Sequence, residues 1–253
     1  MVVRQRRELA ETLGQLTPEQ FRQPSLCAGW SMHDIAAHLT TYLRFGQLKL
    51  YLGIVATAAD IDRINLTLTR WAARRPTAEL IETLHRRAKA RTTIPRSGFD
   101  PVLTDAVLHD LDIRLPLGIR REVVEEHRWV AFNHLARNPA LGYSRGPRLT
   151  QLELVATDAG WRFGSGAAVR GPAEALLLTM SGRDRGWDQL DGDGPARAGL
   201  RRPTEVSSAA PACHGGERVG QPATGRPADP VGGGSGGHAP LKRASGSTSS
   251  RSS

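Results

Sequence analysis

The composition of the chain changes abruptly near residue 196, and this change limits how much of it can fold. The last 57 residues, 197–253, contain 11 Gly, 6 Pro and 9 Ser and no aromatic residue. Such a segment buries too little apolar area to offset its loss of conformational entropy on folding. We therefore expect a disordered tail over 196–253. Two origins stay open for it: a genuine extension, or the out-of-frame product of a frameshift in GC-rich DNA.

The charge of the chain does not indicate a nucleic-acid-binding protein. The formal net charge is +9, and 31 of the 34 basic residues are arginine. The tail carries about half of this excess, and residues 1–196 show no dense basic stripe with interleaved aromatic residues. We expect no specific nucleic-acid partner. A polyanion binder acting through the tail is the rival that the charge alone supports.

Cysteine content and hydropathy exclude several further classes. Two cysteines in 253 residues exclude a disulfide scaffold and a zinc motif built from cysteine alone. The longest apolar runs, such as 173–180, are far short of the roughly 20 residues that span a bilayer. Residues 2–16 carry charges and no apolar signal-peptide core. We therefore expect a soluble cytoplasmic protein with no membrane partner.

The first part of the chain has the apolar spacing and the capping signals of helices. Thr17 to Gln20 reads as an N-cap, a proline at N1 and a glutamine at N3. Ser31 to Asp34 is a second capping signal that opens a long helix over about 32–51. The same reasoning predicts further helices near Leu9 to Leu16, over Ile61 to Trp71, from a cap at Thr77, over about 101–113 and over about 121–137.

The period changes after residue 148, where apolar and polar residues alternate. Leu152, Leu154 and Ala156 are spaced as in a strand. Short strands at 161–163 and 168–170 and a helix over 173–180, ended by Gly182, are expected to follow. The predicted fold class is therefore α+β. We divide it into a mainly helical bundle over 1–145, a small α/β domain over 148–195 and the tail over 196–253.

Three side chains on two predicted helices form a candidate metal site. His38 lies on the apolar face of the helix over 32–51, and Asp105 and His109 are four residues apart on one face of another helix. Two imidazoles and one carboxylate with an open fourth position suit a catalytic zinc ion, although other divalent ions fit too. The competing interpretation is a buried core histidine beside a partly exposed Asp–His contact.

Three stretches of the sequence resemble the DinB/YfiT-like family of mycothiol-dependent maleylpyruvate isomerases. They are PSLCAGWSMHDIAAHL at 24–39, LTDAVLHDLDIRLPLG at 103–118, and LVATDAGW at 154–161 followed by VRGPAEALLL and SGR up to residue 183. They occur in order and together extend the resemblance over about residues 5–195. Each alone is a modest signal, whereas the ordered set is specific.

The resemblance implies a DinB-like four-helix bundle that binds a divalent metal, usually zinc. The family's ligands fall on His38, Asp105 and His109, the trio that spacing also indicates. The acid is Glu in some members, so Asp105 has the shorter reach. The resemblance further implies an enzyme that uses mycothiol as a thiol cosubstrate to isomerise a small electrophile or to transfer the thiol onto it.

Two more residues of the same helix are candidates for supporting roles. Asp112, three residues after His109, is placed to orient an imidazole, or alternatively to form a local ion pair with Arg114. Arg114 is a candidate for binding an anionic thiol or a carboxylate substrate, or alternatively an ordinary surface residue. The alternative to an enzyme is a non-catalytic DinB-like metal-binding sensor or interaction module. The small C-terminal domain leaves a homodimer open.

Overall fold

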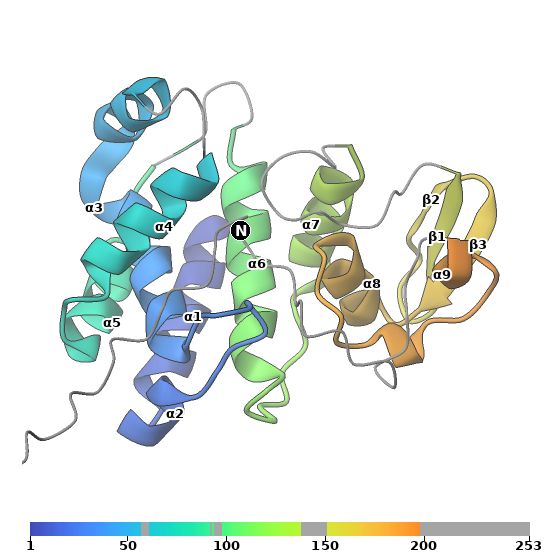
Figure 1. Cartoon of the computed structure of the whole chain (residues 1–253), viewed down its shortest axis with the longest axis horizontal. Helices are drawn as coiled ribbons and strands as arrows, with labels where there is room; N and C mark the ends of the chain where they lie inside the picture. The colour runs from blue at the N-terminus through green and yellow to red at the C-terminus, as the bar shows by residue number, and fades with distance from the viewer. Residues whose placement is uncertain (57–60, 92, 94–97, 138–150, 198–253) are drawn as a thin grey trace, which may run out of the picture. The chain divides into compact units, whose positions relative to one another are not determined.

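The computed structural model describes residues 1–56, 61–91, 93, 98–137 and 151–197 (Figure 1). All of them lie in one compact unit, Met1–Val219; a second unit, Gly220–Ser253, lies outside the described residues. The tail predicted over 196–253 is therefore almost entirely outside them too, and the predicted three-part division stays a prediction. The helices of the N-terminal part are α1 (Val2–Gly14), α2 (Pro18–Arg22), α3 (Met32–Ala56), α4 (Ile61–Ala72), α5 (Thr77–Arg86), α6 (Asp100–Arg114) and α7 (Glu125–Arg137).

Two of the predicted capping signals are confirmed in atomic detail. The hydroxyl of Thr17 accepts a hydrogen bond from the backbone N–H of Gln20, whose side chain accepts one from the N–H of Thr17. Ser31 and Asp34 make the same reciprocal pair at the start of α3. Each pair satisfies N–H groups that a helix start leaves without an intrahelical partner.

The starts of α5 and α7 differ from those predicted from local sequence signals. Thr77 is not a cap, because Pro76 precedes α5 as its N-cap and the Thr77 hydroxyl instead hydrogen-bonds the ring of His33. The helix predicted from residue 121 begins only at Glu125. The backbone carbonyl of Arg121 accepts a hydrogen bond from the side chain of Arg114, which holds this residue in the connection before α7.

Four of the helices close into a bundle, as the family resemblance implied. Helix α1 packs on α5 and α6, and α3 packs on the same two helices. One hydrophobic core fills this bundle, with fully buried side chains from all four helices. Among its members are Leu9, Leu13, Ile35, Leu84 and Ile113. Helix α4 packs against α3 and α7 against α6.

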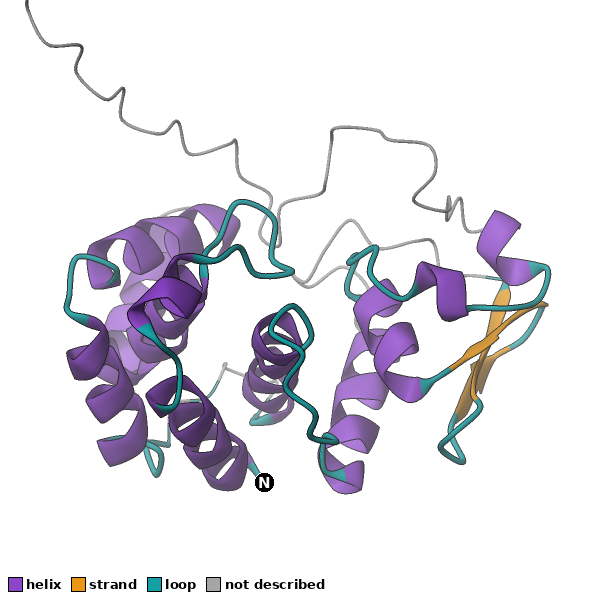
Figure 2. Ribbon diagram, turned by 90° about the horizontal axis from the view of Figure 1, so that it is seen from below, coloured by secondary structure: helices purple, strands orange, loops and turns teal. Residues whose placement is uncertain are grey.

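The C-terminal part contains the predicted small sheet and its helix (Figure 2). Strand β1 (Leu152–Ala156) lies in the middle, antiparallel to β2 (Arg162–Gly164) and parallel to β3 (Ala167–Gly171). Helix α8 (Ala173–Met180) follows and ends, as predicted, before Gly182, whose φ of 77° is left-handed. The sequence did not predict the 3-10 helix η1 (Trp187–Gln189) or α9 (Gly194–Arg197).

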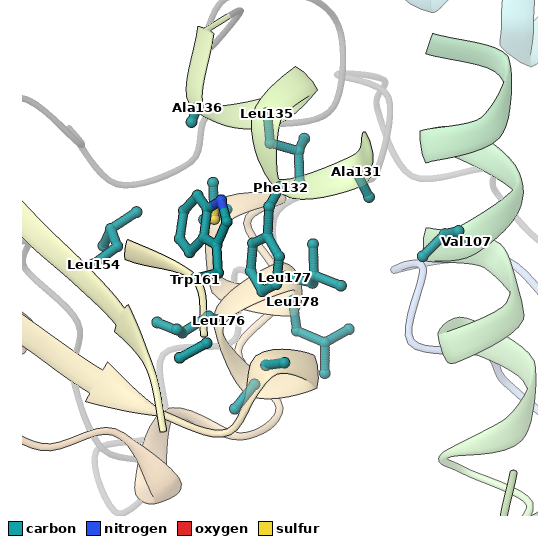
Figure 3. Packing of buried hydrophobic residues seen from close by; sticks show 14 of the residues in the cluster. Val107, Ala131, Phe132, Leu135, Ala136, Leu154, Trp161, Leu176, Leu177 and Leu178 are labelled. Carbon is teal, nitrogen blue, oxygen red and sulfur yellow. The ribbon is translucent and has the colours of Figure 1, made fainter. Parts of the chain in front are cut away.

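A second hydrophobic core joins this part to α6 and α7 (Figure 3). Its centre is Trp161, whose ring stacks on Phe132 with centroids 4.2 Å apart. Helix α6 contributes Val107 to this core and Ile113 to the bundle core, so it is buried on more than one face. Mostly helical with one small sheet, the described fold confirms the α+β prediction. No described helix is long and apolar enough to cross a membrane.

Candidate metal centre

The structure brings the three predicted metal ligands together. Nε2 of His38, on α3, lies 3.4 Å from Oδ1 of Asp105 on α6. Nε2 of His109, one turn further along α6, lies 3.4 Å from the same oxygen. One ligand atom from each residue falls within 4.8 Å of the other two, and no other such cluster of three occurs among the described residues.

These spacings fit a small divalent ion. An ion bound tetrahedrally at about 2.05 Å from each ligand separates two ligand atoms by about 3.3 Å. Both Nε2-to-Oδ1 distances are close to that value. Asp105 therefore reaches the site despite being shorter than the Glu of some family members. The donor set of two imidazoles and one carboxylate leaves one position of a tetrahedron open.

The opposite nitrogen of each imidazole is held by a buried partner. Nδ1 of His109 lies 2.8 Å from Oδ2 of Asp112, and Nδ1 of His38 lies 3.2 Å from the hydroxyl of Thr69. When Nδ1 donates to these oxygens, Nε2 is left with its lone pair free to bind a metal. These contacts fix the orientation of the two rings, and the carboxylate of Asp112, which can only accept, keeps a proton on Nδ1 of His109.

Asp112 is itself held by an arginine that the sequence analysis quoted only as part of a motif. Nε and Nη2 of Arg183 lie 2.6 Å from the two carboxylate oxygens of Asp112, a bidentate pair. Both side chains are buried. The left-handed turn at Gly182, directly after α8, precedes this arginine. A line of contacts from His109 through Asp112 to Arg183 therefore ties the site to the C-terminal part.

The charges of these groups shift one another's pKa values. Burial alone would raise the pKa of Asp112, but Arg183 and then His109 outweigh it and lower that pKa to about 2. Burial alone would lower the pKa of His109, but Asp105 and Asp112 outweigh it and raise it to about 9. Asp105 has its pKa held well below the usual range, since the two histidines outweigh its own burial. In His38 burial prevails and lowers the pKa.

An aromatic side chain from the loop before α3 covers the two imidazoles. The ring of Trp30 is stacked on that of His109, with centroids 6.2 Å apart, and lies tilted 5.2 Å from that of His38. Trp30 belongs to the motif at 24–39, but the sequence alone did not predict that it lies at the site. Asp105 is the predicted ligand that solvent can reach, since its side chain is 22% exposed whereas both histidines are 1–2% exposed.

Arg114 is neither an ordinary surface residue nor the ion-pair partner of Asp112. It is buried, not on the surface, and its Nε donates to Asp110 at 2.6 Å instead of pairing with Asp112. Nη2 lies 3.4 Å from Glu174 of α8, and Nη1 donates to the carbonyl of Arg121. This guanidinium has protein partners on every nitrogen, and a role in substrate binding stays a prediction.

Comparison with known proteins finds a matching domain family for the N-terminal part of the chain. Residues 2–114 match the family model of the mycothiol maleylpyruvate isomerase N-terminal domain. The N-terminal part of the chain, residues 2–114, is thus similar to this domain. The match includes His38, Asp105 and His109, so the whole candidate metal site lies inside it. The resemblance that the sequence motifs indicated is thereby confirmed.

Two solved structures are similar to the chain in fold. One is a histidine-to-alanine mutant of a mycothiol-dependent maleylpyruvate isomerase, with a TM-score of 0.51 and 14% identity over 80% of this chain and 92% of that one. The other is a structure of the mycothiol-dependent maleylpyruvate isomerase, with a TM-score of 0.49 and 13% identity over the same shares. At these identities the likeness to the mutant structure shows the fold alone. The comparison with curated proteins found no match.

Proposed function

We propose that this protein is a metal-dependent enzyme that uses mycothiol to isomerise a small electrophile or to transfer the thiol onto it. One observation carries the proposal: His38 and His109 both direct Nε2 at Asp105, and each ring is held from behind by a buried oxygen. A histidine that only filled a core would not need a carboxylate shared with a second histidine at ligand spacing. The family of the N-terminal domain supports the thiol as cosubstrate.

The chemistry rests on a divalent ion, which we propose to be zinc. His38, Asp105 and His109 would hold it, and a bound ion of this kind lowers the pKa of a coordinated thiol so that the nucleophilic thiolate persists at neutral pH. The surrounding residues orient the two imidazole rings, exclude water from them and leave one side of the metal site open. Asp112 fixes the His109 ring, and Trp30 covers both rings on one face. The exposed edge of Asp105 marks the side on which thiol and electrophile arrive.

The first test is the metal content of the full chain. Elemental analysis of the purified protein should find about one zinc ion per chain, and His109→Ala should lose it. His85, an exposed histidine of α5, provides the matched control: His85→Ala should keep the ion. Absence of metal from the wild type after reconstitution with zinc would overturn the proposal.

The second test separates an enzyme from the non-catalytic alternative. The zinc-loaded wild type should convert maleylpyruvate only when mycothiol is present, and His38→Ala should not. Stoichiometric zinc without thiol-dependent turnover of maleylpyruvate or of other small electrophiles would instead identify a metal-binding sensor or interaction module. The homodimer, the cytoplasmic location and the lack of a nucleic-acid partner stay predictions from the sequence.

A further inference from the structure

A cavity rich in arginine lies apart from the metal site. It has a volume of about 620 Å³ and lies where the C-terminal end of α6 and the connection to α7 meet the N-terminal end of α8. None of His38, Asp105 and His109 lines it. On α6 its first lining residue, Arg114, comes five residues after His109, which is about 7.5 Å along the helix axis. The cavity is therefore a separate candidate site.

Five of the described residues that line the cavity are arginines, and two of these are neutralised by the protein. Arg114 and Arg121 share the buried carboxylate of Asp110, and Arg114 also contacts Glu174. The other three are Arg120, Arg128 and Arg185. Within the described part of the chain, their side chains form no ion pair and no hydrogen bond. Nε of Arg128 is buried without a partner.

The acidic residues of the lining do not balance these three guanidinium groups. Glu174 is engaged by Arg114, and Oδ1 of Asp158 accepts a hydrogen bond from the N–H of Ala173 at the start of α8. Among the described acidic residues of the lining, Glu122 and Asp158 form no ion pair, so two carboxylates oppose three arginines. A buried guanidinium nitrogen without a partner costs free energy, so the cavity is arranged to receive an anion.

Apart from Gln189, the remaining described lining is apolar, which restricts the ligand further. Leu115, Ile119, Pro172 and Leu178 contribute hydrocarbon surface beside the arginines. The volume is within the range of pockets that bind small molecules, which is roughly 300–1,000 Å³. The guanidinium group of arginine can donate two parallel hydrogen bonds to the oxygens of a carboxylate or phosphoryl group. We propose that this cavity binds a small molecule that carries a carboxylate or phosphoryl group on a compact apolar body.

Calorimetric titration of the full chain tests the proposal. The metal is first removed with a chelator, so that no anion binds at the metal site. The probes are succinate and inorganic phosphate at low ionic strength. We expect at least one of them to bind saturably at one molecule per chain. Binding should weaken at least tenfold in Arg128→Gln/Arg185→Gln. It should be unchanged in Arg86→Gln, which removes an exposed arginine of α5 outside the cavity.

The single variant Arg185→Gln and the comparison of the two probes allow a clear result even if the double variant does not fold. Arg185 is exposed, so Arg185→Gln disturbs no buried group and should alone weaken binding at least threefold if the double variant does not fold. A preference for succinate assigns carboxylates to the ligand, and a preference for phosphate assigns phosphoryl groups. No saturable binding of either probe, or an equal loss in Arg86→Gln, overturns the site.

Discussion

Nδ1 of His109 lies 2.8 Å from Oδ2 of Asp112, one turn further along the same buried helix. The same carboxylate is held from the other side by Arg183, which comes 71 residues later in the chain. A ring held in this way cannot rotate its Nε2 away from Asp105 without breaking a charge-assisted hydrogen bond. Removal of the carboxylate should therefore affect the metal site although Asp112 is not a proposed ligand.

The first prediction concerns Asp112→Asn. The amide keeps the shape of the side chain but removes the charge that fixes the donor nitrogen of His109. Changes of this kind around bound metals typically lower affinity 10- to 100-fold. A chelator competition assay on the zinc-loaded protein measures the loss. Asp184→Asn, at an exposed position next to Arg183, is the control and should bind zinc as the wild type does. An affinity unchanged in Asp112→Asn would contradict the role given to this carboxylate.

The second prediction concerns the stability that Arg183 provides. Arg183→Gln leaves the Asp112 carboxylate buried without its bidentate partner, which costs about 3–5 kcal/mol in comparable buried pairs. Urea unfolding of the metal-free protein measures the free energy of unfolding. The double variant Asp112→Asn/Arg183→Gln should lose less than the sum of the two single variants, because neither partner is then left alone. Strict additivity would show that the two groups are not coupled.

The third prediction tests the core around Trp161. Its ring is buried and stacked on Phe132, so Trp161→Ala should lower the free energy of unfolding by about 3–5 kcal/mol. Trp129 of α7, 36% exposed, is the matched control, and Trp129→Ala should change stability by less than about 1 kcal/mol. Thermal unfolding of both variants beside the wild type measures the difference. Equal effects would contradict a C-terminal core centred on Trp161.

The sequence was sufficient for the parts of the fold that depend on local chemistry. The capping pairs Thr17 with Gln20 and Ser31 with Asp34 are short-range devices, and both were found where the spacing predicted them. The alternation over 152–156 likewise identified β1. The prediction that Thr77 is an N-cap was wrong. A threonine before a helical pattern is typical of a cap, but here its hydroxyl hydrogen-bonds to His33, 44 residues away in the chain.

The three candidate metal ligands could be predicted from the sequence, because their placement depends on helical spacing. Their surroundings could not, because they depend on contacts between segments far apart in the chain. Helical spacing puts Asp105 and His109 on one face and His38 on the apolar face of another helix, and the family motif indicates the same three residues. The pair of Asp112 with Arg183 depends on how the chain after α8 returns to α6, and no periodic pattern encodes that path. Arg114 shows the same limit, because its partner Glu174 belongs to a helix 60 residues further on.

The last prediction concerns pH and a histidine outside the metal site. His127 of α7 is buried, with Nδ1 2.7 Å from the side-chain oxygen of Gln5. Burial first, and then the positive charge of the N-terminus, lowers the pKa of His127 below its ordinary value of 6.5. A histidine with a lowered pKa is neutral in the folded state. Its contribution is therefore complete above pH 6.5 and is lost as pH falls toward the lowered pKa, because the unfolded chain then binds the proton more readily.

The His127→Gln variant, which cannot take up the proton, isolates this contribution from those of the other histidines. The free energy of unfolding of the wild type minus that of His127→Gln should be constant from pH 8 to 7 and should fall between pH 6.5 and 5. The slope should be no steeper than about 1.4 kcal/mol per pH unit, the limit for one proton. Urea titrations at each pH measure it, with His85→Gln, an exposed histidine, as control. A difference that rises toward low pH would mean that the fold stabilises a charged His127, contrary to its burial beside Gln5.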